Sequence, residues 1–158
     1  MKTSKPVLVA VGVLAFSLIG FALYLQHVKF ELPCPLCVMQ RYAFATVGLI
    51  SLIVAALPRS VTKIGASLGA LAALTGAGIA SWHLWVKAHP AISCGIDPLE
   101  TSLNKIVTAE LMPYVFKADG LCSTEYEPIL GLSTPQWSLI WFSIFAILLI
   151  WAALRQSR

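Results

Sequence analysis

The residues best suited to chemistry in this sequence are two cysteines three positions apart, Cys34 and Cys37, in the string Pro-Cys-Pro-Leu-Cys. Sulfurs at this spacing can close a small, easily reduced ring, and thiolate chemistry is favoured at a helix N-terminus near a cation. If a helix begins near Leu36 or Cys37, Arg41 follows Cys37 by one turn on the same face. The helix dipole and the guanidinium would then both favour the Cys37 thiolate, which predicts a redox site.

The CxxC spacing by itself leaves other interpretations open. It also occurs in structural disulfides and in one half of a zinc site. A covalently attached c-type haem requires histidine directly after the second cysteine, and position 38 is valine, which excludes that group. A four-cysteine zinc site favours paired ligand spacings, whereas Cys94 and Cys122 are far apart along the chain. We therefore expect no metal.

The elements that must position these cysteines are membrane helices. Of 158 residues, 58% are hydrophobic and 11% are charged, and the mean hydropathy is +0.83. Uncharged runs occupy residues 7–25, 42–57, 64–82 and 137–154, lengths that suit helices crossing a bilayer. We predict one all-α membrane domain over 1–158, a bundle of four spanning helices at about 7–25, 37–57, 63–84 and 136–154. Outer loops then cover about 26–36 and 85–135, and the first helix, which lacks a cleavage pattern, is expected to be retained.

Charge sets the predicted orientation. The ends expected on one side carry only basic residues: Lys2, Lys5, Arg59, Lys63, Arg155 and Arg158. All seven acidic residues fall on the other side, so the positive-inside rule places both termini in the cytoplasm. The net charge of +4 is thus a topology signal and not a nucleic-acid-binding surface. All four cysteines fall in the outer loops, and an even number on an oxidising face predicts two disulfides, with three pairings open.

The second outer loop contains a predicted amphipathic helix. Asp97, Pro98 and Glu100 have the form of a helix start. Apolar residues then recur at helical spacing: Leu99, Leu103, Ile106, Val107 and Leu111. We expect this short helix to lie on the membrane surface, with Lys105 and Glu110 towards water.

Two further side chains are expected near the CxxC pair. Arg41 begins the second helix and His83 ends the third, so both should lie at similar depth beneath Cys37, where they could hold or protonate a polar ring. Two cysteine pairs can pass oxidation between them by thiol–disulfide exchange, and an electron acceptor must then be supplied. Because no flavin or nicotinamide motif is present, a lipid-soluble quinone is the expected acceptor.

Several strings carry a resemblance that covers essentially the whole chain. They are 26–28 (Gln-His-Val), 34–41 (Cys-Pro-Leu-Cys-x-x-x-Arg), 113–116 (Pro-Tyr-Val-Phe), 120–122 (Gly-x-Cys) and 130–137 (Leu-Gly-Leu-x-x-Pro-Gln-Trp). With the order of four helices, they make the sequence similar to the bacterial disulfide bond formation protein B (DsbB) family. The resemblance implies an inner-membrane thiol:quinone oxidoreductase that reoxidises a periplasmic, thioredoxin-like DsbA protein and delivers two electrons to ubiquinone, with menaquinone as the alternative.

The resemblance also implies a role for each candidate residue. Cys94 would form the mixed disulfide with the DsbA-like partner, and Cys122 would be its disulfide partner and would then attack Cys34. Cys37 would be the thiolate next to the quinone, and Arg41 would polarise the quinone oxygen. His83 matches a histidine that the family places near the ring.

Two departures and three alternatives accompany this interpretation. Gln40 stands where some relatives have an acidic residue, and Pro35, which varies in the family, could shift the redox potential of the pair. A vitamin K epoxide reductase-like enzyme would usually have its CxxC near the far end of a helix. A non-catalytic tetraspan protein would use its disulfides only to staple the outer loops. A membrane haem protein would need axial ligands at matching depths, and only His83 is well placed.

Overall fold

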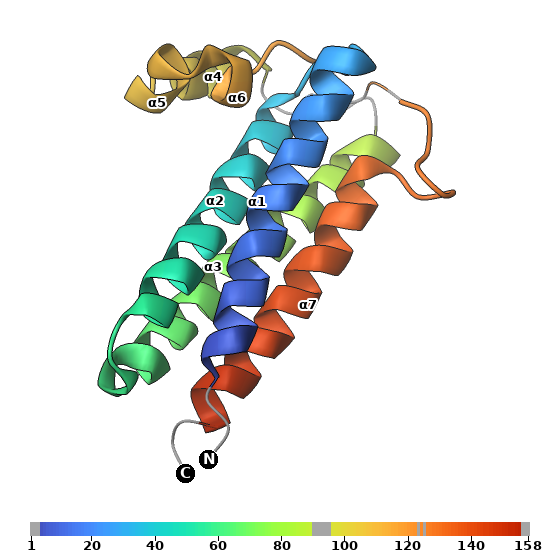
Figure 1. The fold of residues 1–158 in the computed structure, drawn as a ribbon. Helices are drawn as coiled ribbons and strands as arrows, with labels where there is room; N and C mark the ends of the chain where they lie inside the picture. The colour runs from blue at the N-terminus through green and yellow to red at the C-terminus, as the bar shows by residue number, and fades with distance from the viewer. Residues whose placement is uncertain (1–3, 90–95, 123, 125, 156–158) are drawn as a thin grey trace.

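Four long helices form the body of the molecule. The structure is a computed structural model and describes residues 4–89, 96–122, 124 and 126–155. The long helices are α1 (Lys5–Val28), α2 (Pro35–Ala56), α3 (Thr62–Ala88) and α7 (Thr134–Arg155), which run alongside one another in Figure 1. Each is long and apolar enough to cross a membrane, and the described residues form no β-strand. The predicted all-α membrane bundle is confirmed.

The helices extend beyond the uncharged runs from which they were predicted. Helix α1 continues to Val28 and α3 to Ala88, so both outer loops begin later than expected. Hydropathy finds only the segment that suits lipid, whereas backbone hydrogen bonding continues into the polar residues beyond it. Helix α2 begins at Pro35, because proline is well suited to the first helical position. The short 3-10 turn η1 (Arg59–Val61) joins α2 to α3.

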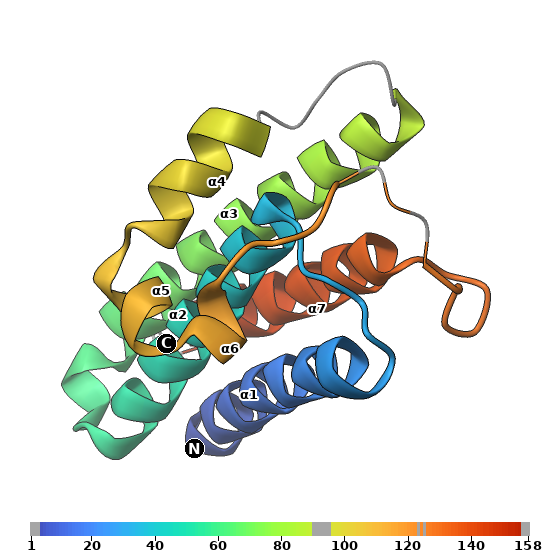
Figure 2. The same cartoon turned by 90° about the horizontal axis from the view of Figure 1, so that it is seen from above.

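The four helices pack unequally. Helix α3 packs most extensively on α7, and α2 packs on both α1 and α3, whereas α1 and α7 touch little (Figure 2). Between α2 and α7, the rings of Phe44 and Phe142 stack with centroids 3.9 Å apart, and Phe145 meets Phe44 edge-on. The side of the bundle between α1 and α7 is therefore the least closed.

Small residues on α3 allow close packing, although the buried row is not the simple four-residue repeat that the sequence shows. That repeat consists of Gly65, Gly69, Ala73, Ala77 and Ser81. Its first three members are buried, whereas Ala77 is half-buried and Ser81 is exposed. Because an α-helix turns about 100° per residue, a four-residue spacing drifts by about 40° at each step. The buried row therefore continues through Gly76, Ala80 and His83.

The outer loop carries three short helices where one was predicted. These are α4 (Ile96–Asn104), α5 (Val107–Leu111) and α6 (Pro113–Phe116), which lie together across one end of the bundle in Figure 1. The side-chain amide of Asn104 donates to the Ala118 carbonyl and accepts from the Ala118 N–H, at 2.9 and 2.8 Å. This pairing coincides with the end of α4, and Ile106 is extended. The predicted helix is therefore interrupted after Asn104, and it begins at Ile96, one residue before the predicted cap at Asp97.

The outer-loop helices are attached to the bundle by α2. The Phe116 ring stacks on Tyr42 with centroids 4.3 Å apart, and the Tyr42 hydroxyl lies 2.6 Å from that of Thr108. Apolar side chains of α5 remain on the outside, with Val107 65% and Leu111 75% exposed. An exposed apolar face is what the predicted position at a membrane surface requires. The start of α1 and the end of α7 lie at the opposite end of the bundle from these helices (Figure 1).

Candidate functional site

The CxxC pair forms the first turn of α2. Cys34 is the N-cap, and its Sγ accepts a hydrogen bond from the Cys37 N–H at 3.3 Å. This contact satisfies one of the backbone donors that every helix N-terminus leaves unpaired. The two sulfurs are unbonded and 3.2 Å apart, with Cys34 only 2% exposed and Cys37 half-buried. The motif thus lies at the start of its helix, which differs from the far-end position expected of a vitamin K epoxide reductase-like enzyme.

The two sulfurs are not equivalent. The hydrogen bond to Cys37, followed by burial, raises the pKa of the Cys34 thiol above its ordinary value. Cys34 therefore keeps its proton at neutral pH and donates it to the Cys37 sulfur. The sequence argument relied instead on the helix dipole and Arg41, so the greater nucleophilicity of Cys37 stays a prediction.

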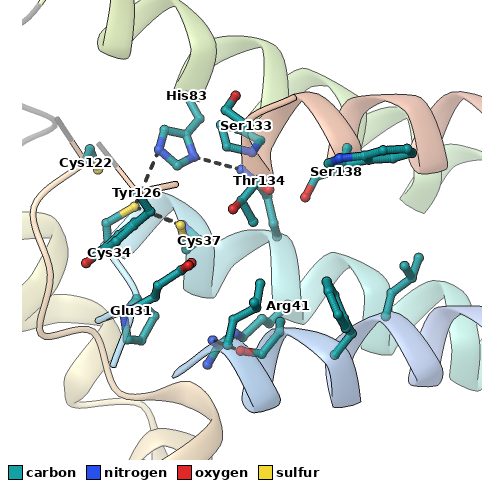
Figure 3. A pocket seen from close by; sticks show the side chains of 18 of the residues that line it. Glu31, Cys34, Cys37, Arg41, His83, Cys122, Tyr126, Ser133, Thr134 and Ser138 are labelled. Carbon is teal, nitrogen blue, oxygen red and sulfur yellow. Dashed lines mark hydrogen bonds between the residues drawn. The ribbon is translucent and has the colours of Figure 1, made fainter. Parts of the chain in front are cut away.

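His83 reaches the pair from α3. Its Nε2 lies 3.7 Å from Cys34 Sγ, and its Nδ1 lies 3.1 Å from the side-chain amide nitrogen of Gln40 (Figure 3). His83 and Gln40 are 3% and 4% exposed. Sequence reasoning placed His83 near the CxxC but treated Gln40 only as a departure from relatives. The available signal was that a buried amide on an apolar helix requires a hydrogen-bonding partner.

Arg41 is buried and donates hydrogen bonds to three protein groups. One guanidinium nitrogen donates to Gln26 Oε1 and to the Val115 carbonyl, both at 2.7 Å, and the other donates to the Ala22 carbonyl at 3.5 Å. The side chain is 6% exposed, so it does not extend to lipid headgroups, the alternative for an arginine at this depth. Arg41 therefore joins α2 to α1 and to α6, and it also lines the cavity described next.

A cavity of about 290 Å³ brings the predicted side chains together. Cys34, Cys37, Arg41 and His83 all line it, as Figure 3 shows. The apolar lining comes from α1, α2 and α7 and includes Leu18, Ile19, Phe21, Phe44, Trp137 and Trp141. The site thus combines thiols, the Arg41 guanidinium and the His83 imidazole at the polar end of an apolar chamber, with Lys87 as a second basic residue in the lining.

Cys122 is held against the CxxC pair by a crossing of the two outer loops. It is buried in a cluster with Cys34, Leu36 and Val86, and it is disulfide-bonded. The backbone N–H groups of Asp119 and Gly120 both donate to the Pro33 carbonyl, at 3.0 and 3.1 Å. Cys94, the remaining predicted site residue, lies outside the described residues.

Two further residues at the cavity were not predicted. Burial raises the pKa of the Glu31 carboxyl; the charges of Cys37 and Glu127 add to this effect and Lys29 opposes it. Burial likewise raises the pKa of Tyr126, whose hydroxyl donates to the Leu32 carbonyl at 3.1 Å. Both side chains line the cavity beside the sulfurs.

Comparison with known proteins shows the family of the chain. The family model described as "Disulfide bond formation protein DsbB" matches residues 4–152. A disulfide bond formation protein B from Herminiimonas arsenicoxydans is 58% identical over 157 residues, covering 99% of each chain. One from Ralstonia nicotianae is 45% identical over 98% of this chain and 97% of its own. Disulfide bond formation protein B 1 of Pseudomonas syringae pv. syringae is 42% identical over 100% of this chain and 94% of its own. The chain belongs to the disulfide bond formation protein B family.

Proposed function

We propose that this protein reoxidises a DsbA-like periplasmic thiol oxidase and passes the two electrons to a membrane quinone. Family membership supports an oxidoreductase role in disulfide bond formation. The observation that carries the finer proposal is the position of the CxxC pair. The pair borders an apolar chamber, and Arg41 and His83 line the same chamber.

The thiol half of the reaction uses both outer loops. A thiolate of the partner attacks a disulfide between Cys94 and Cys122, which releases the Cys122 thiolate and leaves the partner bonded to Cys94. The second thiol of the partner then attacks this mixed disulfide, which releases the Cys94 thiolate and leaves the partner with its own two cysteines joined in a disulfide. Cys122 attacks Cys34 of an oxidised CxxC pair, and Cys37 departs as the thiolate; the Cys94 thiolate then displaces Cys34 from Cys122. The packing of Cys122 against Cys34 supports this exchange, since the sulfurs must meet in line.

The chamber fits a quinone headgroup by its chemistry. Its apolar walls from α1 and α7 suit an isoprenoid-bearing ring, and Arg41 supplies a cation at the polar end. A quinone held there would supply the acceptor for the two electrons and two protons that leave the CxxC pair as it closes to a disulfide. His83 Nε2 lies 3.7 Å from Cys34 Sγ and would take the Cys34 proton as that bond forms, once the Gln40 amide turns its oxygen to Nδ1 and the lone pair lies on Nε2. Phe21 lines the chamber and is exposed, so the chamber extends to the lipid-facing side of α1.

The location follows from the same chemistry. We place the protein in the bacterial inner membrane, with both termini in the cytoplasm and the cysteines on the periplasmic side. Basic residues at the chain ends and at η1 support this orientation. Disulfide exchange requires an oxidising compartment, which the periplasm provides.

The decisive experiment follows ubiquinone absorbance while purified protein in detergent oxidises a reduced DsbA-like protein. We expect catalytic quinone loss that disappears in Cys37→Ser. That variant should retain exchange between the outer-loop disulfide and the partner. Cys122→Ser should show the opposite pattern, losing oxidation of the protein partner but retaining quinone reduction with a small dithiol. Folded protein that reduces neither ubiquinone nor menaquinone would instead indicate a non-catalytic tetraspan stapled by disulfides.

A further inference from the structure

Three potential metal ligands meet at the N-terminus of α2. One ligand atom from each of Cys34, Cys37 and His83 lies within 4.8 Å of the other two, and the nitrogen that faces Cys34 Sγ is His83 Nε2, although 49 residues separate Cys34 from His83. We propose that the reduced protein binds one Zn²⁺ ion through these three atoms. Such an ion would be an inhibitor whose site exists only while the CxxC pair is reduced.

The distances match the coordination geometry of zinc. In a tetrahedral site with Zn–S of about 2.3 Å and Zn–N of about 2.0–2.1 Å, two sulfurs lie about 3.8 Å apart. A sulfur and a nitrogen lie about 3.6 Å apart in the same geometry. The observed separations are 3.2 Å between Cys34 and Cys37 and 3.7 Å between Cys34 and His83. The sulfurs need to separate by only about half an ångström to enclose the ion.

Gln40 provides the outer contact that a zinc-binding histidine requires. When Nε2 binds metal, the ring proton lies on Nδ1, and such histidines usually donate it to an oxygen. The Gln40 side-chain amide lies 3.1 Å from His83 Nδ1, with its nitrogen nearest. A half-turn of the amide exchanges nitrogen for oxygen at the same place, so Oε1 would accept the proton. A neutral glutamine can therefore form a hydrogen bond with His83 Nδ1 whether or not that nitrogen carries a proton.

Charge and access also favour this ion. Two thiolates balance the charge of Zn²⁺, so the complex carries no net charge into a buried site. Thiolate and imidazole ligands select zinc over the oxygen-preferring Mg²⁺ and Ca²⁺. Cys34 and His83 are buried, whereas Cys37 is only half-buried and borders the cavity, which leaves a fourth position for water.

Binding is a ligand exchange without electron transfer. Zn²⁺ forms one bond to each of the two sulfurs, and each thiol loses its proton as its sulfur binds. Two protons are therefore released when both cysteines start in the protonated form. A Cys34–Cys37 disulfide has no thiolate to offer, so the oxidised protein has no site. While the ion is bound, a lone pair of each sulfur is donated to the metal, so the two cysteines cannot be oxidised to a disulfide. Inhibition of turnover rests on the proposed function, but binding itself does not.

The test uses the full-length chain with Cys94→Ala and Cys122→Ala, so that only the CxxC thiols remain. Purified in detergent and kept anaerobic, the reduced protein is titrated with Zn²⁺ against a competing chelator. Co²⁺ reports geometry through thiolate charge-transfer and tetrahedral d–d absorption. We expect one ion per chain in the reduced form and none in the oxidised form. No quinone is present, so a negative result leaves the proposed oxidoreductase activity untouched.

Matched variants identify the third ligand. Gln40→Leu should weaken Zn²⁺ binding by about 10- to 100-fold, the usual effect of losing an outer contact. His83→Gln should weaken it further, whereas His89→Gln, at the exposed C-cap residue that follows the same helix, should not. His83→Cys supplies a replacement thiolate and should restore binding with a stronger charge-transfer band. Equal affinity in His83→Gln and His89→Gln, ion binding to the oxidised chain, or no restoration by His83→Cys would overturn the proposal.

Discussion

Arg41 serves the architecture and the proposed chemistry with the same guanidinium. Its hydrogen bonds to Gln26 and to the Val115 carbonyl hold α1 and α6 to α2. Hydrogen bonds from a charged group contribute about 1.5–3 kcal/mol each, so Arg41→Ala should lower thermal stability in detergent. It should also lower quinone reduction more than exchange with a thiol partner, because the cation faces the chamber.

Arg41→Lys separates these two roles. The lysine keeps the positive charge but lacks the planar fork that donates in two directions. We therefore expect it to recover part of the quinone-dependent rate, measured by quinone absorbance, while thermal stability stays below that of the wild type. Equal losses of both reactions in the alanine and lysine variants would restrict Arg41 to a folding role.

Glu31 makes stability depend on pH. Its pKa is higher in the folded protein than its ordinary value of 4.5, chiefly through burial. Ionisation is thus more costly in the folded state, and stability that is present below the unfolded pKa is lost as pH rises through the folded pKa. Glu31→Gln should therefore raise the melting temperature at pH 7 and leave it nearly unchanged at pH 4.

The comparison requires thermal unfolding of both proteins at each pH. Glu110→Gln, at an exposed carboxyl on α5, controls for the loss of one negative charge. A Glu31→Gln protein that melts at or below the wild-type temperature at pH 7 would contradict the assignment.

The sequence predicted the chemistry of the site better than its contacts. Cys34, Cys37 and His83 were identified by residue type and by their position near helix ends, and the structure brings them together. The contact between Gln40 and His83 joins residues 43 positions apart. It depends on how α2 and α3 are rotated about their axes, and hydropathy does not fix that rotation when every face of a helix is apolar.

At the scale of elements, the two outer loops are joined by a close backbone crossing at Gly120. A Cβ added to Gly120 would collide with the Leu32 carbonyl oxygen, a backbone atom that cannot move aside unless the loop moves with it. Gly120→Ala should therefore disturb the hydrogen bonds to Pro33 and slow electron transfer from Cys122 to Cys34. The measurement is the rate at which a reduced protein partner reduces the CxxC pair.

Gly78→Ala is the matched control, because an added Cβ there meets nothing within 4 Å. Alanine in place of an exposed helical glycine should be neutral or stabilising by up to about 1 kcal/mol. Quinone reduction by a small dithiol should survive in Gly120→Ala, because a small dithiol can reduce the CxxC pair without passing through Cys122. An unchanged rate with the protein partner would show that the crossing does not position Cys122.

The number and order of long helices were predictable because each requires only an apolar run of sufficient length. The outer loop was less predictable for a physical reason. The interruption after Asn104 coincides with its two hydrogen bonds to Ala118, fourteen residues away, which local periodicity does not show. Amphipathic spacing correctly indicated helix and an apolar face, but not where the helix would be interrupted.

At the scale of the whole molecule, the chemistry and the topology depend on each other. The CxxC loop lies at the end of the bundle opposite the start of α1 and the end of α7 (Figure 1). A C-terminal green fluorescent protein should therefore fluoresce, and alkaline phosphatase at the same position should be inactive, because basic termini favour the cytoplasm. Phosphatase inserted after Leu130, an 88% exposed residue of the outer loop, should be active. The reverse pattern would place the cysteines in a reducing compartment, where a disulfide relay would not persist. That result would remove the basis of the proposed function even if every contact around Cys34 were correct.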